Sequence, residues 1–117
     1  VGADHVLPDE ATRAFYPTAL SWRDREVADL VAQPGNAEEL ASAVGIATRA
    51  GMAVVPRGGG MSYTSGYTPE RKHSMLVDMR RMNKIVEINT DDMYVIVETG
   101  CTWKDLYEAL APHGVRT

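Results

Sequence analysis

Three consecutive glycines, Gly58, Gly59 and Gly60, follow a short apolar run and constrain this chain more than any other feature. Successive residues without a Cβ let the backbone adopt positive φ angles and turn neighbouring N–H groups inward, which forms a concavity suited to an anion such as phosphate. Arg57 before the glycines and the Ser62 hydroxyl after them add further hydrogen-bond donors. Glycines are also the usual residues of a tight surface turn after a strand. The run alone leaves a phosphate-binding loop and a plain turn equally open.

The residues before the glycines predict a β-α-β unit. Residues 28–32 form a short apolar run, and residues 52–55 form a second one that leads into the loop. Between them, Asn36 is typical of a helix N-cap, and Glu39 stands at the position of its capping-box partner. Small and apolar residues then recur at helical spacing up to Gly51, which we expect to follow the helix as its C′ residue.

The residues after the loop predict three more strands and a final helix. A strand is expected over residues 74–79 and a hairpin over 84–88 and 93–98, whose connection is rich in turn formers. Thr102 is expected to cap a helix, with Asp105 as its capping-box partner. This order predicts an α+β domain: a βαβ unit followed by a mixed-sheet hairpin and a C-terminal helix, with the helices on one side of the sheet.

Residues 1–26 are expected to form an N-terminal arm, and residues 27–117 the domain that follows it. The arm is mixed in composition and interrupted by prolines, and its large side chains are Trp22 and the adjacent Phe15 and Tyr16. With 117 residues, the chain holds at most one small domain. It does not begin with methionine, so we expect a processed or excised piece of a longer protein.

Composition and charge argue against several classes of function. The formal net charge of −4 argues against nucleic-acid binding, and the basic group Arg80, Arg81 and Lys84 is interpreted as a solvated turn between strands. No apolar run approaches the roughly 18 residues of a membrane span, and residues 1–10 lack the apolar stretch of a secretory signal. Cys101 is the only cysteine, and no Cys/His spacing is typical of a metal site. This favours a reducing, cytoplasmic setting and no metal.

Two common phosphate loops do not fit the sequence. A P-loop needs Lys and Ser or Thr after its last glycine and a helix that begins at once, whereas Gly60 is followed by a polar stretch without helical periodicity over residues 61–66. A Rossmann fingerprint needs a glycine pattern that opens a helix and an acidic residue about 20 positions further on. Asp78 stands at a tolerable distance, but it ends a strand that follows a long loop. We therefore expect loop amides, and not a helix dipole, to hold an anion here.

Three blocks of the sequence together resemble a known family. Residues 56–66, 75–88 and 97–107 look like the N-terminal FAD-binding subdomain of the vanillyl-alcohol oxidase/p-cresol methylhydroxylase flavoprotein superfamily, in the same order and with similar spacing. The resemblance covers residues 29–117. It implies that FAD is the cofactor and that the fold is the first half of an FAD-binding domain of the PCMH type.

In that family the glycine loop donates backbone amides to the FAD pyrophosphate. Several relatives attach the flavin to a histidine where this chain has Met61, and a thioether cannot form that bond, so covalent attachment at this loop is excluded. Gly100 resembles a residue that admits a close backbone approach near the cofactor, and residues 78–79 and 82–83 resemble a stretch that shapes the sheet. The resemblance assigns cofactor binding to Arg57, Gly58, Gly59, Gly60, Met61 and Ser62.

The resemblance also implies that the full-length protein is a flavin-dependent oxidoreductase acting on a small-molecule substrate: an alcohol, a phenol or a 2-hydroxy acid. The second glycine-containing segment and the cap domain of the family lie outside these 117 residues. Catalytic residues are therefore not assigned, and the fragment alone is expected to be inactive and to bind FAD weakly. A homo-oligomer is left open.

Two other functions stay open at this point. One is a non-catalytic module in which the loop binds a phosphate ligand, takes part in an interaction, or only forms a turn. The other is a reductase that uses FAD with a nicotinamide nucleotide, as in related cell-wall enzymes.

Overall fold

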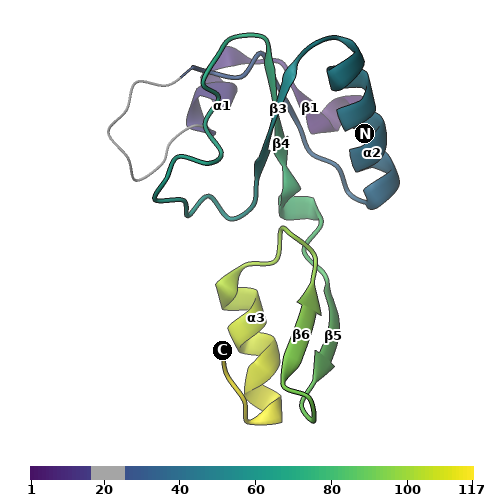
Figure 1. Ribbon diagram of the computed structural model, residues 1–117, viewed down its shortest axis with the longest axis vertical. Coiled ribbons are helices and arrows are strands. Elements are labelled where there is room, and N and C mark those ends of the chain that lie inside the picture. Colours follow the sequence, from purple (N-terminus) through teal and green to yellow (C-terminus); the bar gives the residue numbers. More distant parts are fainter. Residues whose placement is uncertain (17–25) are drawn as a thin grey trace.

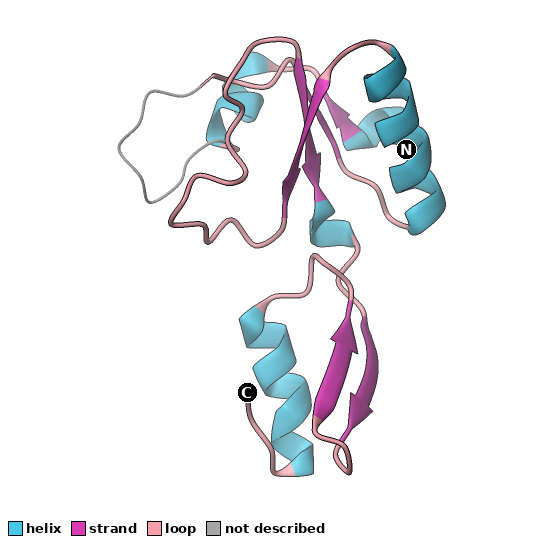
Figure 2. Cartoon of the chain, viewed as in Figure 1, coloured by secondary structure: helices cyan, strands magenta, loops and turns pink. Residues whose placement is uncertain are grey.

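The described residues of the chain form two lobes, which η2 connects (Figure 1). The computed structural model describes residues 1–16 and 26–117; Trp22, expected as an anchor of the N-terminal arm, lies outside these residues. The first lobe holds a four-stranded sheet, and the second holds a two-stranded sheet with a helix beside it (Figure 2). In chain order the elements are η1 (Ala3–His5), β1 (Val6–Leu7), α1 (Glu10–Phe15), β2 (Leu30–Ala32), α2 (Ala37–Arg49), β3 (Ala53–Arg57), β4 (Ser74–Asp78), η2 (Met79–Arg81), β5 (Ile85–Asn89), β6 (Tyr94–Val97), α3 (Trp103–Leu110) and η3 (Ala111–His113).

The sheet of the first lobe has the strand order β1-β2-β4-β3. β2 and β3 both run parallel to β4, which lies between them, and β1 pairs antiparallel with β2. β2, α2 and β3 thus form the predicted β-α-β unit, and β4 is inserted between its two strands. All five residues of β4 are buried, as expected for a central strand that is covered on both faces.

Both faces of this sheet are covered, which corrects the expectation that the helices lie on one side of it. On one face, α2 packs through Ala47 against Met75 and Val77. On the opposite face, Tyr16, directly after α1, packs against Leu76. Because successive residues of a strand point to opposite faces, the continuous apolar run of β4 needs cover on both sides. The N-terminal residues supply the second cover.

The helix predicted between the first two strands is confirmed as α2, with one difference at its start. The Asn36 side chain accepts a hydrogen bond from the backbone N–H of Glu39 at 2.9 Å, as predicted for the N-cap. The Glu39 carboxylate accepts from the backbone N–H of Gly35 at 2.8 Å instead of that of Asn36, so the predicted reciprocal half of the capping box is wrong. Gly51 follows the helix with a φ of 71°, the left-handed conformation expected there.

β3 is longer than predicted and contains a proline. The sequence predicts that this strand ends at Val55, whereas the pairing with β4 continues through Pro56 to Arg57. β3 lies at the edge of the sheet, where a strand tolerates a residue without an N–H. The glycine loop begins directly after Arg57.

The second lobe contains the predicted hairpin and C-terminal helix. β5 and β6 pair antiparallel and form a sheet of their own, separate from the mixed sheet of the first lobe. Thr102 and Asp105 form the complete capping box that the sequence predicts, and Leu106 and Leu110 of α3 are buried. The α+β fold class is therefore confirmed. Among the described residues, no helix is both long and apolar enough to cross a membrane.

Candidate cofactor site at the glycine loop

The glycine loop, residues 58–62, faces the start of α3 across an open cavity of about 520 Å³. The loop leaves the end of β3 in the first lobe, whereas α3 belongs to the second lobe, so the cavity lies between the two (Figure 1). Five of the six residues predicted to bind the cofactor line it. The lining residues are Gly58, Gly59, Gly60, Met61, Ser62, Tyr67, Cys101, Thr102, Trp103 and Lys104.

The backbone of the loop offers free hydrogen-bond donors beside this cavity. Within residues 1–16 and 26–117, the N–H groups of Gly59, Gly60 and Met61 donate no hydrogen bond. Gly60 has a φ of 80°, and a Cβ added to Gly59 would meet no atom within 4 Å. Unpaired N–H groups next to open space are what a backbone needs in order to hold a phosphate group.

Ser62 shapes the loop from within. Its Oγ accepts hydrogen bonds from the backbone N–H groups of Gly66 at 3.1 Å and Thr64 at 3.3 Å. The hydroxyl that the sequence predicts as a ligand donor closes the turn after the glycines in this structure, as Ser side chains often do. It fixes the direction in which the chain leaves the loop.

Arg57 lies behind the loop, and it is the one predicted binding residue that does not line the cavity. The residue is only 7% exposed. Its guanidinium carbon lies 5.5 Å from the ring centre of Tyr16 and 5.3 Å from that of Tyr67. Its Nε and Nη1 atoms are buried and have no hydrogen-bond partner in the described part of the chain. The Tyr67 hydroxyl also donates to the carbonyl oxygen of Gly60 at 2.7 Å, so both side chains support the loop.

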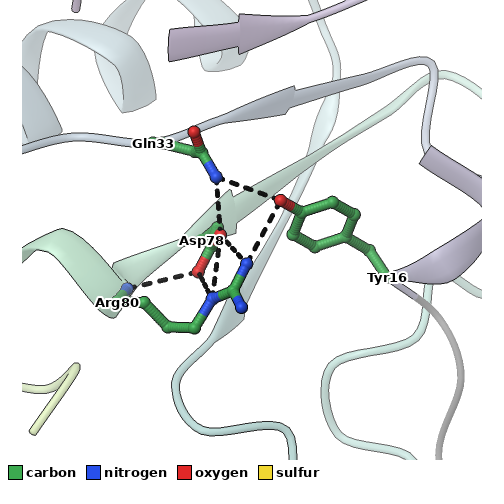
Figure 3. A network of polar contacts seen from close by, with 4 residues as sticks. All are labelled: Tyr16, Gln33, Asp78 and Arg80. Carbon is green, nitrogen blue, oxygen red and sulfur yellow. Dashed lines mark hydrogen bonds and ion pairs between the residues drawn. The ribbon is translucent and has the colours of Figure 1, made fainter. Parts of the chain in front are cut away.

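A polar network holds Tyr16 in place (Figure 3). Asp78, at the end of β4, is 1% exposed and lies 2.8 Å from the guanidinium of Arg80. Gln33 Nε2 donates to Asp78 at 2.9 Å and to the Tyr16 hydroxyl at 3.0 Å. Arg80 Nη2 donates to the same hydroxyl at 3.3 Å. The network therefore joins the residue after α1 to β4 and η2.

The titration of these groups follows from burial and from their hydrogen bonds. Burial alone would raise the pKa of Asp78, but the hydrogen bonds from Arg80 and Gln33 outweigh it and hold that pKa below its usual value. The hydrogen bond to Asp78 raises the pKa of Arg80. Burial, followed by the nearby charge of Asp78, raises the pKa of Tyr16. At neutral pH the network therefore contains a carboxylate, a guanidinium and a neutral phenol.

The basic group at residues 80–84 is not simply a solvated turn, which corrects the sequence interpretation. Arg80 belongs to the network with Asp78. Arg81 Nη1 donates to the carbonyl oxygen of Gln33 at 2.6 Å and lies 3.8 Å from the Glu39 carboxylate. Asp78 lies only two residues from Arg80, whereas Tyr16, the other partner of Arg80, and Gln33, the partner of Arg81, are distant in sequence, so the local pattern does not reveal them. Lys84 is exposed, as expected.

The start of α3 is a part of this site that the sequence analysis missed. A helix N-terminus carries unpaired N–H groups and a partial positive charge, whereas the sequence predicts that loop amides hold the anion without a helix dipole. The capping box at Thr102 predicts where α3 starts, but it does not predict that this start lies opposite the loop. The turn that leads into α3 contains Gly100. A Cβ on Gly100 would lie 2.0 Å from the carbonyl oxygen of Met79. The close backbone approach expected at Gly100 is thus present, with η2 as its partner.

Residues 28–117 match the family described as the FAD binding domain. The match covers more than half of the chain, so this protein belongs to that family of FAD-binding domains, and FAD is its cofactor. The predicted relationship to flavoproteins of the PCMH type is confirmed by the structural similarities that follow.

The chain is 33% identical over 89 residues to the mitochondrial D-lactate dehydrogenase (cytochrome) of Kluyveromyces lactis, a match that covers 74% of this chain and 16% of that protein. Among solved structures, 4-ethylphenol oxidase from Gulosibacter chungangensis is 31% identical with a TM-score of 0.83, covering 97% of this chain and 23% of that one. p-Cresol methylhydroxylase, 20% identical, shares the fold with a TM-score of 0.83 over 97% of this chain and 23% of its own. The chain therefore spans less than a quarter of the length of each.

Proposed function

We propose that this chain is the part of a flavin-dependent oxidoreductase that holds the FAD pyrophosphate, and that the glycine loop makes the contact. The observation that carries the proposal is the row of loop N–H groups beside a cavity that donate to no other described residue, in a chain whose family binds FAD. The proposed binding residues are Arg57, Gly58, Gly59, Gly60, Met61 and Ser62.

Each part of the site has a distinct role in this proposal. The loop N–H groups donate hydrogen bonds to the phosphate oxygens, and the absence of a Cβ at Gly59 leaves room for them. The buried Arg57 guanidinium adds positive charge from behind the loop, and the N-terminus of α3 adds its dipole from across the cavity. Met61 carries a thioether, so the loop holds the cofactor without a covalent bond to the flavin.

The substrate we propose is an alcohol, a phenol or a 2-hydroxy acid. Two similar proteins are by name a D-lactate dehydrogenase and a 4-ethylphenol oxidase, which supports the last two classes. FAD, when bound, supplies the acceptor for a hydride from the substrate. Anaerobic addition of D-lactate, 4-ethylphenol and a simple alcohol to the full-length holoprotein tests this. Loss of the oxidised flavin absorbance with one of them is expected, and no change with any of the three would contradict the proposal.

The assignment of the loop is tested with Gly59→Val in the full-length protein. The added side chain points into open space, so we expect the melting temperature of the apoprotein to stay unchanged. The Kd for FAD, measured by titration, is expected to rise at least about tenfold because the side chain occupies the space of the phosphate. Gly2→Val is the matched control, since its Cβ also meets no atom within 4 Å, and its Kd should equal that of the wild type. A loop that only forms a turn predicts equal affinity for both variants.

Several narrower proposals concern the chain as a whole. The 117 residues alone are proposed to bind FAD weakly and to be inactive, which calorimetric titration and an activity assay of the isolated chain test. A cytoplasmic location, supported by the lone Cys101, is tested by cell fractionation, and a homo-oligomer by sedimentation. The boundary between an arm over residues 1–26 and the domain after it is tested by limited proteolysis.

A further inference from the structure

Arg57 is a buried cation whose surroundings are aromatic. No ion pair joins it to an acidic side chain among the described residues. The rings of Tyr16 and Tyr67 instead lie within 5.5 Å of its guanidinium carbon. A buried charge is costly unless it has a partner, and the electron-rich face of an aromatic ring is a partner for a guanidinium. The two rings therefore determine where this guanidinium can lie.

The position of the guanidinium matters because Gly60 lies against it. A Cβ added to Gly60 would be 2.4 Å from Arg57 Nη2, and Gly60 has the positive φ that turns the loop. The Gly60 carbonyl oxygen is held by the hydroxyl of Tyr67. The direction of the neighbouring free N–H groups therefore depends on Arg57 and the two tyrosines.

Tyr16 comes from outside residues 28–117, the part of the chain that matches the family. It follows α1 and is 5% exposed. Its hydroxyl accepts hydrogen bonds from Gln33 and Arg80, which are themselves bound to Asp78 (Figure 3). The ring is thus held at its hydroxyl end by the network, and the guanidinium carbons of Arg57 and Arg80 lie 5.5 Å and 5.7 Å from its centre.

We propose that Tyr16 is a positioning residue for the cofactor site: by stacking on Arg57, it holds Gly60 and the free N–H groups of the loop in the conformation that binds FAD. This inference rests on the proposed function, in which the loop contacts the pyrophosphate. It makes Tyr16 a part of the site, although Tyr16 is not one of the residues that line the cavity.

Two substitutions in the full-length protein separate the ring from the hydroxyl. Tyr16→Phe keeps the ring on Arg57 and loses only the hydrogen bonds, so the Kd for FAD is expected to stay within about threefold of the wild type. Tyr16→Leu removes the ring and keeps an apolar side chain, and the Kd is expected to rise about tenfold, as for the loss of a desolvated cation–π contact. Rescue by phenylalanine shows that the ring and not the hydroxyl is required, and a separate control distinguishes this requirement from a loss of stability.

Leu7→Ala is the matched control, because Leu7 packs on the same apolar cluster as Tyr16. It is expected to lower the melting temperature and leave the Kd for FAD within about threefold of the wild type, since it leaves the ring on Arg57 in place. Equal Kd values for Tyr16→Leu and Leu7→Ala would overturn the inference.

If Tyr16→Leu does not fold, phenylalanine analogues with increasing fluorination at position 16 keep the shape of the ring and weaken its attraction for a cation. A stepwise rise in Kd is expected, and a constant Kd would overturn the inference. Gly59→Val distinguishes the two levels of the proposal. If it binds FAD like the wild type, the pyrophosphate assignment fails and this inference with it. If it loses FAD while Tyr16→Leu does not, only this inference fails.

Discussion

The backbone of Gly100 lies directly against the carbonyl group of Met79. A Cβ on Gly100 would be 2.0 Å from the Met79 oxygen and 2.7 Å from its carbonyl carbon, distances that no side chain can occupy. The N–H of Gly100 also donates to the carbonyl oxygen of Met82 at 2.8 Å. The turn that leads into α3 is thereby held against η2.

Gly100→Ala is therefore expected to destabilise the protein strongly. The added methyl group meets backbone on the neighbouring turn, which cannot move aside as a flexible side chain can. We expect the free energy of unfolding to fall by about 3 kcal/mol, at the upper end for overpacking, as measured by urea denaturation. Gly2→Ala, whose Cβ meets nothing within 4 Å, should be neutral. Equal stability of the two variants would show that the close approach is absent.

Gly60→Ala is expected to weaken both stability and FAD binding. Its φ of 80° is unfavourable for an L-residue by about 1–2 kcal/mol, and the new Cβ would displace the Arg57 guanidinium behind the loop. Gly59→Ala is the neighbouring control for stability, because its methyl group has open space. Denaturation and FAD titration of the two variants make the comparison. If both keep the stability of the wild type, the left-handed turn at Gly60 is not required.

Asp78→Asn is expected to lower stability at neutral pH. The substitution removes the charge that accepts hydrogen bonds from Arg80 and Gln33 at a position that is 1% exposed. We expect a loss of about 2 kcal/mol, a typical value for hydrogen bonds to a charged group. A larger loss is not expected, because the Arg80 side chain is 45% exposed and solvent screens its charge.

The loss of stability caused by Asp78→Asn is also expected to depend on pH. Its pKa is lower in the folded protein than the usual 3.8, so the folded state binds fewer protons there than the unfolded state. The stabilisation is present above the usual pKa and disappears as the pH falls through the lower, folded value. The difference between wild type and Asp78→Asn should stay constant from neutral pH to about 5 and shrink below about 4. Asp91→Asn, in the exposed hairpin turn, is the control. A stability difference between wild type and Asp78→Asn that grows as the pH falls would contradict the proposed stabilising role of the Asp78 carboxylate.

Asn36→Ala tests a local feature far from the site. The side chain caps α2 by accepting from the N–H of Glu39, and loss of such a cap costs about 1 kcal/mol. Thermal or urea denaturation measures the effect, and Asn36→Asp, which keeps the acceptor, should recover most of it. FAD affinity should not change in either variant. A neutral Asn36→Ala would mean that the N-terminus of α2 is satisfied by other groups.

Features that depend on neighbours in sequence were predictable from the sequence. The central strand was predictable because of its continuous apolar run. The starts of the helices at Asn36 and Thr102 were predictable because a cap needs only a polar side chain and the next turn of the chain. The glycine loop and its place after a strand were visible for the same reason. Whether its residues contact the pyrophosphate stays a prediction.

Features that depend on distant partners were not predictable. Tyr16 and Arg57 meet only because the N-terminal residues cover the sheet face opposite α2, and nothing in the local pattern of either residue indicates the other. β1 has two residues, too few for an alternating pattern to appear. The place of α3 opposite the loop and the contact between Gly100 and Met79 were not predictable either, because a single sequence presents Gly100 only as a glycine in a turn.

The edge strands of the first-lobe sheet affect whether two copies of the molecule can associate by strand pairing. β1 offers only two residues to an incoming strand, and β3 presents the exposed Pro56, which has no N–H to donate. A chain that tried to extend the sheet at β3 would lose a hydrogen bond there. Among the described residues, extension of the first-lobe sheet from one copy of the molecule to the next is therefore disfavoured at both of its edges.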